Sequence, residues 1–201
     1  MRLVLILIAL LAGTVTGAAA ESRLLRSADT HPGDYPTVQA VVFLGQRLSE
    51  ATSGRLGVRV HHSRLLGEES DTVALAIDGG LDMTRVNLAL LAKLSEEAAI
   101  ATLPYLFRSP GHMHTVLDGA IGAEILASLE PAGLVGLAFY DSGARSFYTV
   151  DKPVRSPADL AGLKIRVQNS ESAMAMVRAL GATPTPLEFG QVQDALKVKV
   201  I

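Results

Sequence analysis

The 201-residue sequence contains no cysteine and no tryptophan, and only 4% of its residues are aromatic. Without cysteine the chain cannot form a disulfide, a thiol nucleophile, a cysteine-ligated zinc or iron–sulfur site, or a lipid anchor on an N-terminal cysteine. Because aromatic rings are so few, the chain has little from which to build a platform on which bases or sugars stack.

The sequence also has no excess of basic residues. It contains 18 lysines and arginines against 20 aspartates and glutamates, which gives a formal net charge of −2. Proteins that bind nucleic acid or an anionic membrane surface usually carry a basic excess, so we expect neither partner. Hydrophobic residues make up 49% of the chain, which is enough for a packed core and argues against disorder.

The first twenty residues are typical of a secretory signal peptide. Arg2 is followed by an unbroken apolar run over Leu3–Ala12 and then by three small residues at Ala18–Ala20. This pattern predicts cleavage before Glu21 and export to the periplasm. The alternative is an uncleaved membrane anchor, which polar and small residues in the second half of the segment disfavour. No later segment has eighteen consecutive apolar residues, so we expect a soluble mature protein.

After residue 20, strand-like and helix-like segments alternate. This alternation predicts an α/β fold with a mostly parallel sheet, in which ligands lie at the carboxyl ends of the strands. A last helix is expected to begin near Gly190 and to continue to the end of the chain. Hydrophobic periodicity predicts strands over 22–28, 56–62, 81–86, 134–140, 145–150 and 163–167, and helices over 37–52, 70–77, 110–117, 121–129 and 172–180.

One local pattern determines the orientation of an arginine. Ser156 is a good N-cap, and Pro157 and Asp159 favour the first turn that follows it. The helical turn ends at Gly162, and a short strand follows. Side chains alternate along a strand, so the apolar residues of 163–167 face the core while Arg166 faces outward.

Several ordered motifs in the sequence resemble the solute-binding proteins of TRAP transporters, the DctP-like family. The resemblance extends over essentially the whole chain after residue 20. The segments that carry it are Ser63–Glu68, Gly79–Met83, Leu103–Phe107, Pro153–Val154, Pro157–Leu160, Gly162–Val167 and Ala179–Leu187.

This resemblance implies a two-lobed periplasmic binding protein fold whose second lobe is incomplete, because family members continue past the point where this chain stops. We expect a signal peptide over 1–20, a first α/β lobe over 21–147 and a partial second lobe over 148–201. The implied function is the capture of a small organic carboxylate, such as a dicarboxylate, a 2-oxo acid or a sugar acid. The ligand would be delivered to the membrane permease subunits of a TRAP transporter, and no cofactor is expected.

The resemblance also implies which residues contact the ligand. Arg166 stands where the family binds carboxylates, and a planar guanidinium suits a carboxylate because it can form two parallel hydrogen bonds. Arg145 resembles a second ligand arginine, and Asn87, Phe189 and His31 are further candidates. Each has a structural alternative: a surface arginine for the first two, a helix N-cap for Asn87, a core ring for Phe189 and a turn residue for His31.

Three further residues fall at positions that the resemblance places near the ligand cleft. The adjacent acids Glu68 and Glu69 resemble an acidic pair near the cleft in some relatives, but we interpret them as partners of a helix dipole. Lys199 stands where some members carry a ligand-contacting asparagine.

The sequence gives little support to catalysis or metal binding. His61 and His62 would point to opposite faces of a strand, and His112 and His114 would be about 200° apart on a helix. No nucleophile elbow, P-loop or dinucleotide-binding glycine motif is present. We therefore expect neither an enzyme nor a metal site. The alternatives are a periplasmic sensing module or enzyme on the same scaffold, or a fragment without function.

Overall fold

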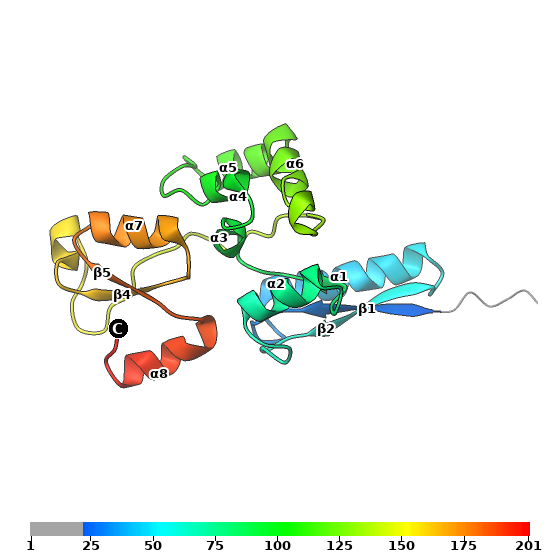
Figure 1. The fold of residues 1–201 in the computed structure, drawn as a ribbon, viewed down its shortest axis with the longest axis horizontal. Coiled ribbons are helices and arrows are strands. Elements are labelled where there is room, and N and C mark those ends of the chain that lie inside the picture. Colours follow the sequence, from blue (N-terminus) through cyan, green and yellow to red (C-terminus); the bar gives the residue numbers. More distant parts are fainter. Residues whose placement is uncertain (1–21) are drawn as a thin grey trace, which may run out of the picture.

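The computed structural model describes residues 22–201, so the predicted signal peptide lies outside the described residues. Two separate parallel sheets lie toward opposite ends of the molecule, each with its own helices (Figure 1). This arrangement confirms the predicted two-lobed α/β architecture.

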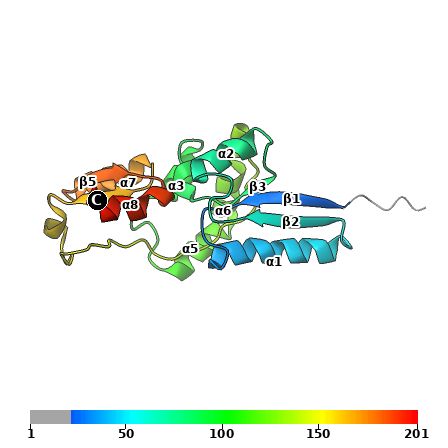
Figure 2. The same cartoon turned by 90° about the horizontal axis from the view of Figure 1, so that it is seen from below.

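The first lobe is built on a three-stranded parallel sheet of order β2-β1-β3. The two connecting helices, α1 and α2, lie on opposite faces of this sheet (Figure 2). Helix α1 packs closely because it has glycine at position 45, where a Cβ would come within 2.9 Å of Val58 Cβ. The elements are β1 (Arg23–Ala28), α1 (Pro36–Ala51), β2 (Leu56–His61), α2 (Glu69–Ile77) and β3 (Met83–Thr84).

A cluster of short helices follows the first sheet and lies beside it (Figure 1). Serine side chains at positions 95 and 109 accept hydrogen bonds from backbone N–H groups and so begin two of these helices. Their shared core contains Leu91, Ala98, Ile125 and Leu129. The elements are α3 (Leu88–Leu91), α4 (Glu96–Ile100), α5 (Pro110–Leu117), α6 (Ala120–Ala127) and η1 (Glu130–Ala132).

The second lobe contains a two-stranded parallel sheet against which α7 packs. Its core consists of Leu160, Val167, Met174, Val177 and Ala182. The elements are η2 (Pro157–Leu160), β4 (Lys164–Val167), α7 (Glu171–Ala179), β5 (Thr183–Pro186), η3 (Phe189–Gln191) and α8 (Val192–Lys197).

Strand β5, which contains two prolines, was not predicted from the hydrophobic pattern of the sequence. The N–H groups of Thr183 and Leu187 donate to carbonyls of Leu163 and Val167, on the β4 side. Backbone groups alternate in direction along a strand, so the nitrogens of Pro184 and Pro186 point away from β4, where no N–H is needed.

Two predicted strands are wrong. Residues 134–140 and 145–150 run through a segment without regular secondary structure, because no other described strand lies beside either one to pair with it. Strand β3 is shorter than predicted, and the last helix ends at Lys197 rather than continuing to the end of the chain. Lys199 is exposed and has a φ of 57°, a backbone conformation that asparagine adopts more readily than lysine.

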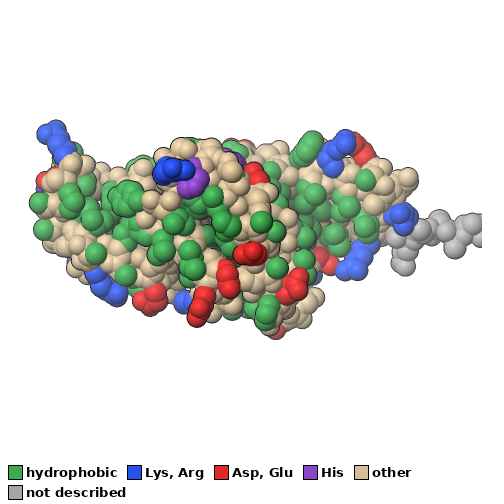
Figure 3. Space-filling model, turned by 90° about the horizontal axis from the view of Figure 1, so that it is seen from above, with side chains coloured by type: hydrophobic (Ala, Val, Ile, Leu, Met, Phe, Trp, Pro, Cys, Tyr) green, Lys and Arg blue, Asp and Glu red, His purple; other side chains and the backbone are tan. Residues whose placement is uncertain are grey.

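Within residues 22–201, no helix is long and apolar enough to cross a membrane. Apolar side chains nevertheless reach the surface in many places, and they alternate with charged ones over the face in Figure 3. The most exposed large apolar side chains include Val135, Leu137, Tyr148 and Val150, all in the segment that was wrongly predicted as strands.

Candidate ligand-binding site

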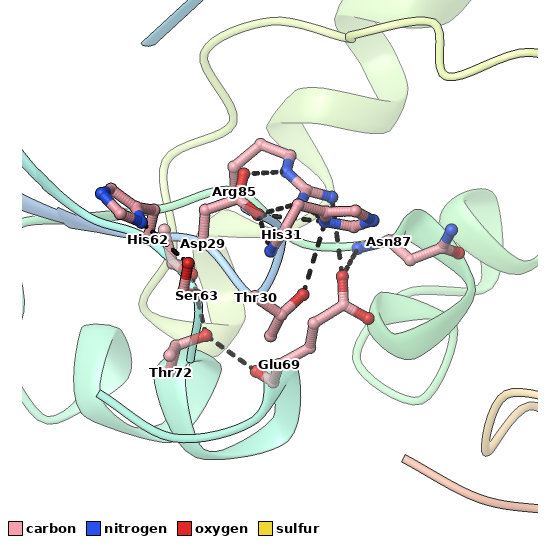
Figure 4. A network of polar contacts seen from close by, with 10 residues as sticks. Asp29, Thr30, His31, His62, Ser63, Glu69, Thr72, Arg85 and Asn87 are labelled. Atoms are coloured by element: carbon pink, nitrogen blue, oxygen red, sulfur yellow. Dashed lines mark hydrogen bonds and ion pairs between the residues drawn. The ribbon is translucent and has the colours of Figure 1, made fainter. Parts of the chain in front are cut away.

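The carboxyl ends of the first-lobe strands face the second lobe (Figures 1 and 2). Asp29 directly follows β1, Arg85 directly follows β3, and Glu69 is the first residue of α2. Their side chains converge in a polar network that also includes His31 (Figure 4). Parallel strands thus bring together groups that are far apart in sequence, at the edge where this class of fold binds ligands.

The centre of this polar network is a two-pronged ion pair. Arg85 Nε donates to Asp29 Oδ2 at 2.6 Å, and Arg85 Nη2 donates to Asp29 Oδ1. The side chain of Asp29 is 1% exposed and that of Arg85 is 14% exposed. The pair is therefore shielded from solvent, and each partner compensates the charge of the other.

Burial and hydrogen bonding act differently on the two carboxylates. Burial favours the neutral form of Asp29, but hydrogen bonds from His31 and Arg85 outweigh it and lower the pKa of Asp29 below its usual value. Burial also favours the neutral form of Glu69, and here it prevails, so the pKa of Glu69 is raised. Glu69 is 6% exposed and lies 3.6 Å from Arg85 Nη1, so it is more than the partner of a helix dipole that the sequence suggested.

His31 lies where the two lobes meet. Its Nδ1 atom is 3.1 Å from Asp29 Oδ1 and contacts Arg85 Nη2. Its ring stacks on Tyr35 at a centroid distance of 4.2 Å and on Phe189 of the second lobe at 5.0 Å. The structure therefore brings together two of the predicted site residues, His31 and Phe189, from opposite lobes.

Asn87 has the structural role that was its alternative. Its side-chain oxygen accepts a hydrogen bond from Ala89 N at 3.0 Å and so caps α3. Its backbone N–H donates to Glu69 Oε1 at 2.9 Å. Asn87 thus positions the buried carboxylate of Glu69 through its main chain and caps α3 through its side-chain oxygen, and its predicted ligand contact stays a prediction.

The two predicted arginines lie close enough to repel each other. Arg166 extends from β4 and is partly buried, and its Nε and Nη2 atoms donate to the carbonyl of Leu187 at 2.9 and 2.7 Å. Burial and the positive charge of Arg145 lower the pKa of Arg166. Arg145 itself is exposed, on the extended segment between the lobes.

Three glutamates act electrostatically on Arg166 without contacting it directly. The charges of Glu69, Glu188 and Glu68 all raise the pKa of Arg166. Nevertheless, among residues 22–201, no carboxylate oxygen lies within 4.0 Å of Arg166 or Arg145. The arrangement combines an arginine pair that can bind an anion with acidic groups that can accept hydrogen bonds from hydroxyls.

The sequence analysis did not select Asp29, Arg85 or Glu188 as site residues. The signal for Asp29 was present, since it directly follows the predicted strand over 22–28 at its carboxyl end. Arg85 lay inside the predicted strand over 81–86, and it follows β3 only because that strand ends at Thr84. The signal for Glu188 was its position next to Phe189. As for metals, no group of three potential ligands is found in the described part of the chain.

Comparison with known proteins identifies the family. The profile DctP, described as bacterial extracellular solute-binding protein, family 7, matches residues 27–201. A solute-binding protein of Chromohalobacter salexigens is 34% identical over 88% of this chain and 52% of its own length. The 2,3-diketo-L-gulonate-binding periplasmic protein YiaO of Escherichia coli is 34% identical over 96% of this chain and 59% of its own length.

Solved structures agree with this family. A TRAP periplasmic solute-binding protein of Bradyrhizobium, in complex with galacturonate, is 54% identical with a TM-score of 0.86, over 89% of this chain and 60% of that one. A Xanthobacter autotrophicus relative with bound β-D-galacturonate is 46% identical with a TM-score of 0.85. The chain thus spans between about half and 60% of the length of these relatives. It belongs to family 7 of the bacterial extracellular solute-binding proteins, the DctP family.

Proposed function

We propose that this protein is the periplasmic solute-binding component of a TRAP-type transporter and that it captures a sugar acid. The observation that carries this proposal is the pair of Arg166 and Arg145. Arg166 holds the carbonyl of Leu187, next to the segment that meets the first lobe, and within the described chain neither of these two arginines has a carboxylate oxygen within 4.0 Å. A ligand carboxylate would relieve the repulsion between the two guanidinium groups. It could also accept two parallel hydrogen bonds from a guanidinium group, the geometry for which arginine is suited.

The acidic surroundings favour a sugar acid over a dicarboxylate. Beyond the arginines the site carries Glu68, Glu69 and Glu188, whose charges act on Arg166. Sugar hydroxyls can donate hydrogen bonds to these carboxylates, whereas a second ligand carboxylate would meet like charge. The galacturonate and glucuronate ligands of the similar structures support the same class.

The remaining elements of this proposal follow from family membership. The chain would bind its ligand between a first lobe over 21–147 and a second lobe over 148–201, and release it unchanged to membrane permease subunits. Ligand contacts with both lobes would exist only when the lobes are together, so binding would favour closure. As a carrier, the protein needs no catalytic group and no cofactor.

A thermal-shift screen tests the ligand class. D-Galacturonate and D-glucuronate should raise the melting temperature of the full chain, because they bind the folded state only. Succinate and malate, which carry a second carboxylate, should produce a smaller shift or none. A larger shift with the dicarboxylates would overturn the sugar-acid assignment while leaving the arginine anchor intact.

Export is a separate expected outcome. The apolar run over Leu3–Ala12 and the small residues at Ala18–Ala20 predict that the mature chain begins at Glu21. Mass spectrometry of the periplasmic fraction should detect this N-terminus. Detection of intact Met1 in the membrane fraction would show instead that the segment remains as an anchor.

A further inference from the structure

The second lobe contacts the first at two places: the hydroxyl of Ser172 in α7 lies 3.2 Å from that of Thr102, and the short segment Glu188–Gly190 meets the start of α2. Ser70 Oγ, in the first turn of α2, donates to Glu188 Oε1 at 3.2 Å. The backbone N–H of Gly190 points to Glu68 Oε2 at 3.5 Å. Phe189, between them, stacks on His31. Three consecutive residues of the second lobe therefore contact the loop and helix start that precede the first-lobe site.

The carboxylate of Glu68 is held in place from its own lobe. It faces the backbone N–H of Asp71 in a capping box, in which Glu68 N–H donates to Asp71 Oδ2 at 2.9 Å, and Arg64 Nε lies 3.6 Å from Oε1. These contacts lie within the first lobe. They restrain the Glu68 carboxylate at the place where Gly190 approaches it.

Gly190 is required by the contact between the lobes and not by its backbone. Its φ lies outside the left-handed region, so other residues could adopt its conformation. A Cβ at this position, however, would lie 2.2 Å from Glu68 Oε1 and 3.1 Å from Arg64 Cζ. While the two lobes are together, a side chain at position 190 therefore requires Glu68 to move from its observed position.

We propose that Glu68 and Ser70 of the first lobe and Glu188 and Gly190 of the second form an interlobe latch. These groups contact each other rather than requiring a ligand between them, so the latch contributes to the closed state on its own. It shifts the open–closed equilibrium toward closure, in addition to the Thr102–Ser172 contact, and Gly190 is its positioning residue. The affinity for any ligand that needs closure scales with the fraction of molecules that are closed.

The absence of cysteine makes the latch directly measurable. Cysteines introduced at the exposed positions Gln46 on α1 and Arg178 on α7 provide two unique sites for spin labels, one on each lobe. Pulsed electron paramagnetic resonance of the full labelled chain then reports the distribution of distances between the lobes. The test variants are Gly190→Val, which cannot close without displacing Glu68, and Ser70→Ala, which removes one hydroxyl of the latch.

A matched control is Gly111→Val in α5, where a Cβ would meet nothing within 4 Å. Without ligand, Gly190→Val should shift the distance distribution to longer values, Ser70→Ala should shift it less, and Gly111→Val should leave it unchanged. If Gly190→Val fails to fold, the comparison of Ser70→Ala with Gly111→Val still tests the latch, because only Ser70→Ala should lengthen the distances between the lobes. Distributions identical to the parent in both test variants would overturn the latch.

Ligand binding provides a second readout that rests on the proposed function. A tenfold loss of the closed fraction should weaken galacturonate binding by about tenfold, mainly through faster dissociation. If no sugar acid binds to any variant, the proposed function fails while the ligand-free distances still test the latch. If the distances shift but affinity does not, closure is not coupled to this ligand and the role of Gly190 in binding is refuted.

Discussion

Replacing Arg166 by alanine is expected to weaken sugar-acid binding by about thirtyfold to several thousandfold. Removal of one partner of a buried, hydrogen-bonded charge pair costs about 2–5 kcal/mol, largely because the other charge is left without compensation. Arg166→Lys should also weaken binding strongly, because an ammonium retains the charge but cannot form two parallel hydrogen bonds to a carboxylate. Calorimetric titration with D-galacturonate measures both losses.

Two other arginines serve as comparisons for Arg166. Arg145→Ala should cost less, because Arg145 is exposed and its interactions are screened by solvent. Arg178→Ala, on the exposed side of α7, should leave affinity unchanged. Equal affinities for the wild type and Arg166→Lys would mean that Arg166 is an ordinary strand arginine that holds the Leu187 carbonyl, and that the ligand carboxylate binds elsewhere.

Replacing Arg85 by methionine is expected to lower the free energy of unfolding by about 3–5 kcal/mol at neutral pH. The change removes the two-pronged partner of Asp29, whose side chain is 1% exposed, and leaves a buried carboxylate without compensation. The double variant Asp29→Asn/Arg85→Met should lose less than Arg85→Met alone. An asparagine oxygen can still accept the hydrogen bond from His31 N, so that Asp29 no longer adds an uncompensated buried charge to that of Glu69. Urea denaturation of the three proteins measures the difference.

The effect of Arg85→Met should depend on pH. Because the folded-state pKa of Asp29 is depressed, its stabilising contribution is present above the unfolded pKa of about 3.9 and disappears as the pH falls through the folded value. Removal of Arg85 abolishes much of that contribution. The difference in the free energy of unfolding between wild type and Arg85→Met should therefore be largest near neutral pH and become smaller below about pH 4. The raised pKa of Glu69 acts in the opposite sense, since its burial favours folding at low pH. A difference in the free energy of unfolding that does not change with pH would contradict the claim that Arg85 stabilises the ionised carboxylate of Asp29.

Local rules of the chain predicted much of the fold. Hydrophobic periodicity predicted a helix over 110–117, and α5 has these bounds, with Ser109 as its N-cap and Pro110 in its first turn. The capping pattern at Ser156 and the alternation after Gly162 correctly predicted β4, with Val167 in the core and Arg166 on the other face. These features depend on neighbours within one or two turns, which a single sequence displays directly.

The features that were missed depend on contacts between distant segments. The pairing of Asp29 with Arg85 joins residues 56 positions apart, and no local pattern signals it. Strand β5 violates the expectation that proline avoids strands, and only its register on β4 explains why both prolines are tolerated. Residues 134–140 and 145–150 have the alternation of strands but find no strand to pair with among the described residues.

The most direct test of the central claim compares D-galacturonate with D-galactose, which differs by lacking the carboxylate. If the arginine pair anchors the ligand acid, calorimetric titration of the wild-type protein should show binding of D-galacturonate. Binding of D-galactose should be weaker by at least about thirtyfold, the lower bound expected for the loss of one partner of a buried charge pair. Equal binding of the two sugars, or binding of neither, would contradict the assignment of Arg166 and Arg145 as a carboxylate site for sugar acids.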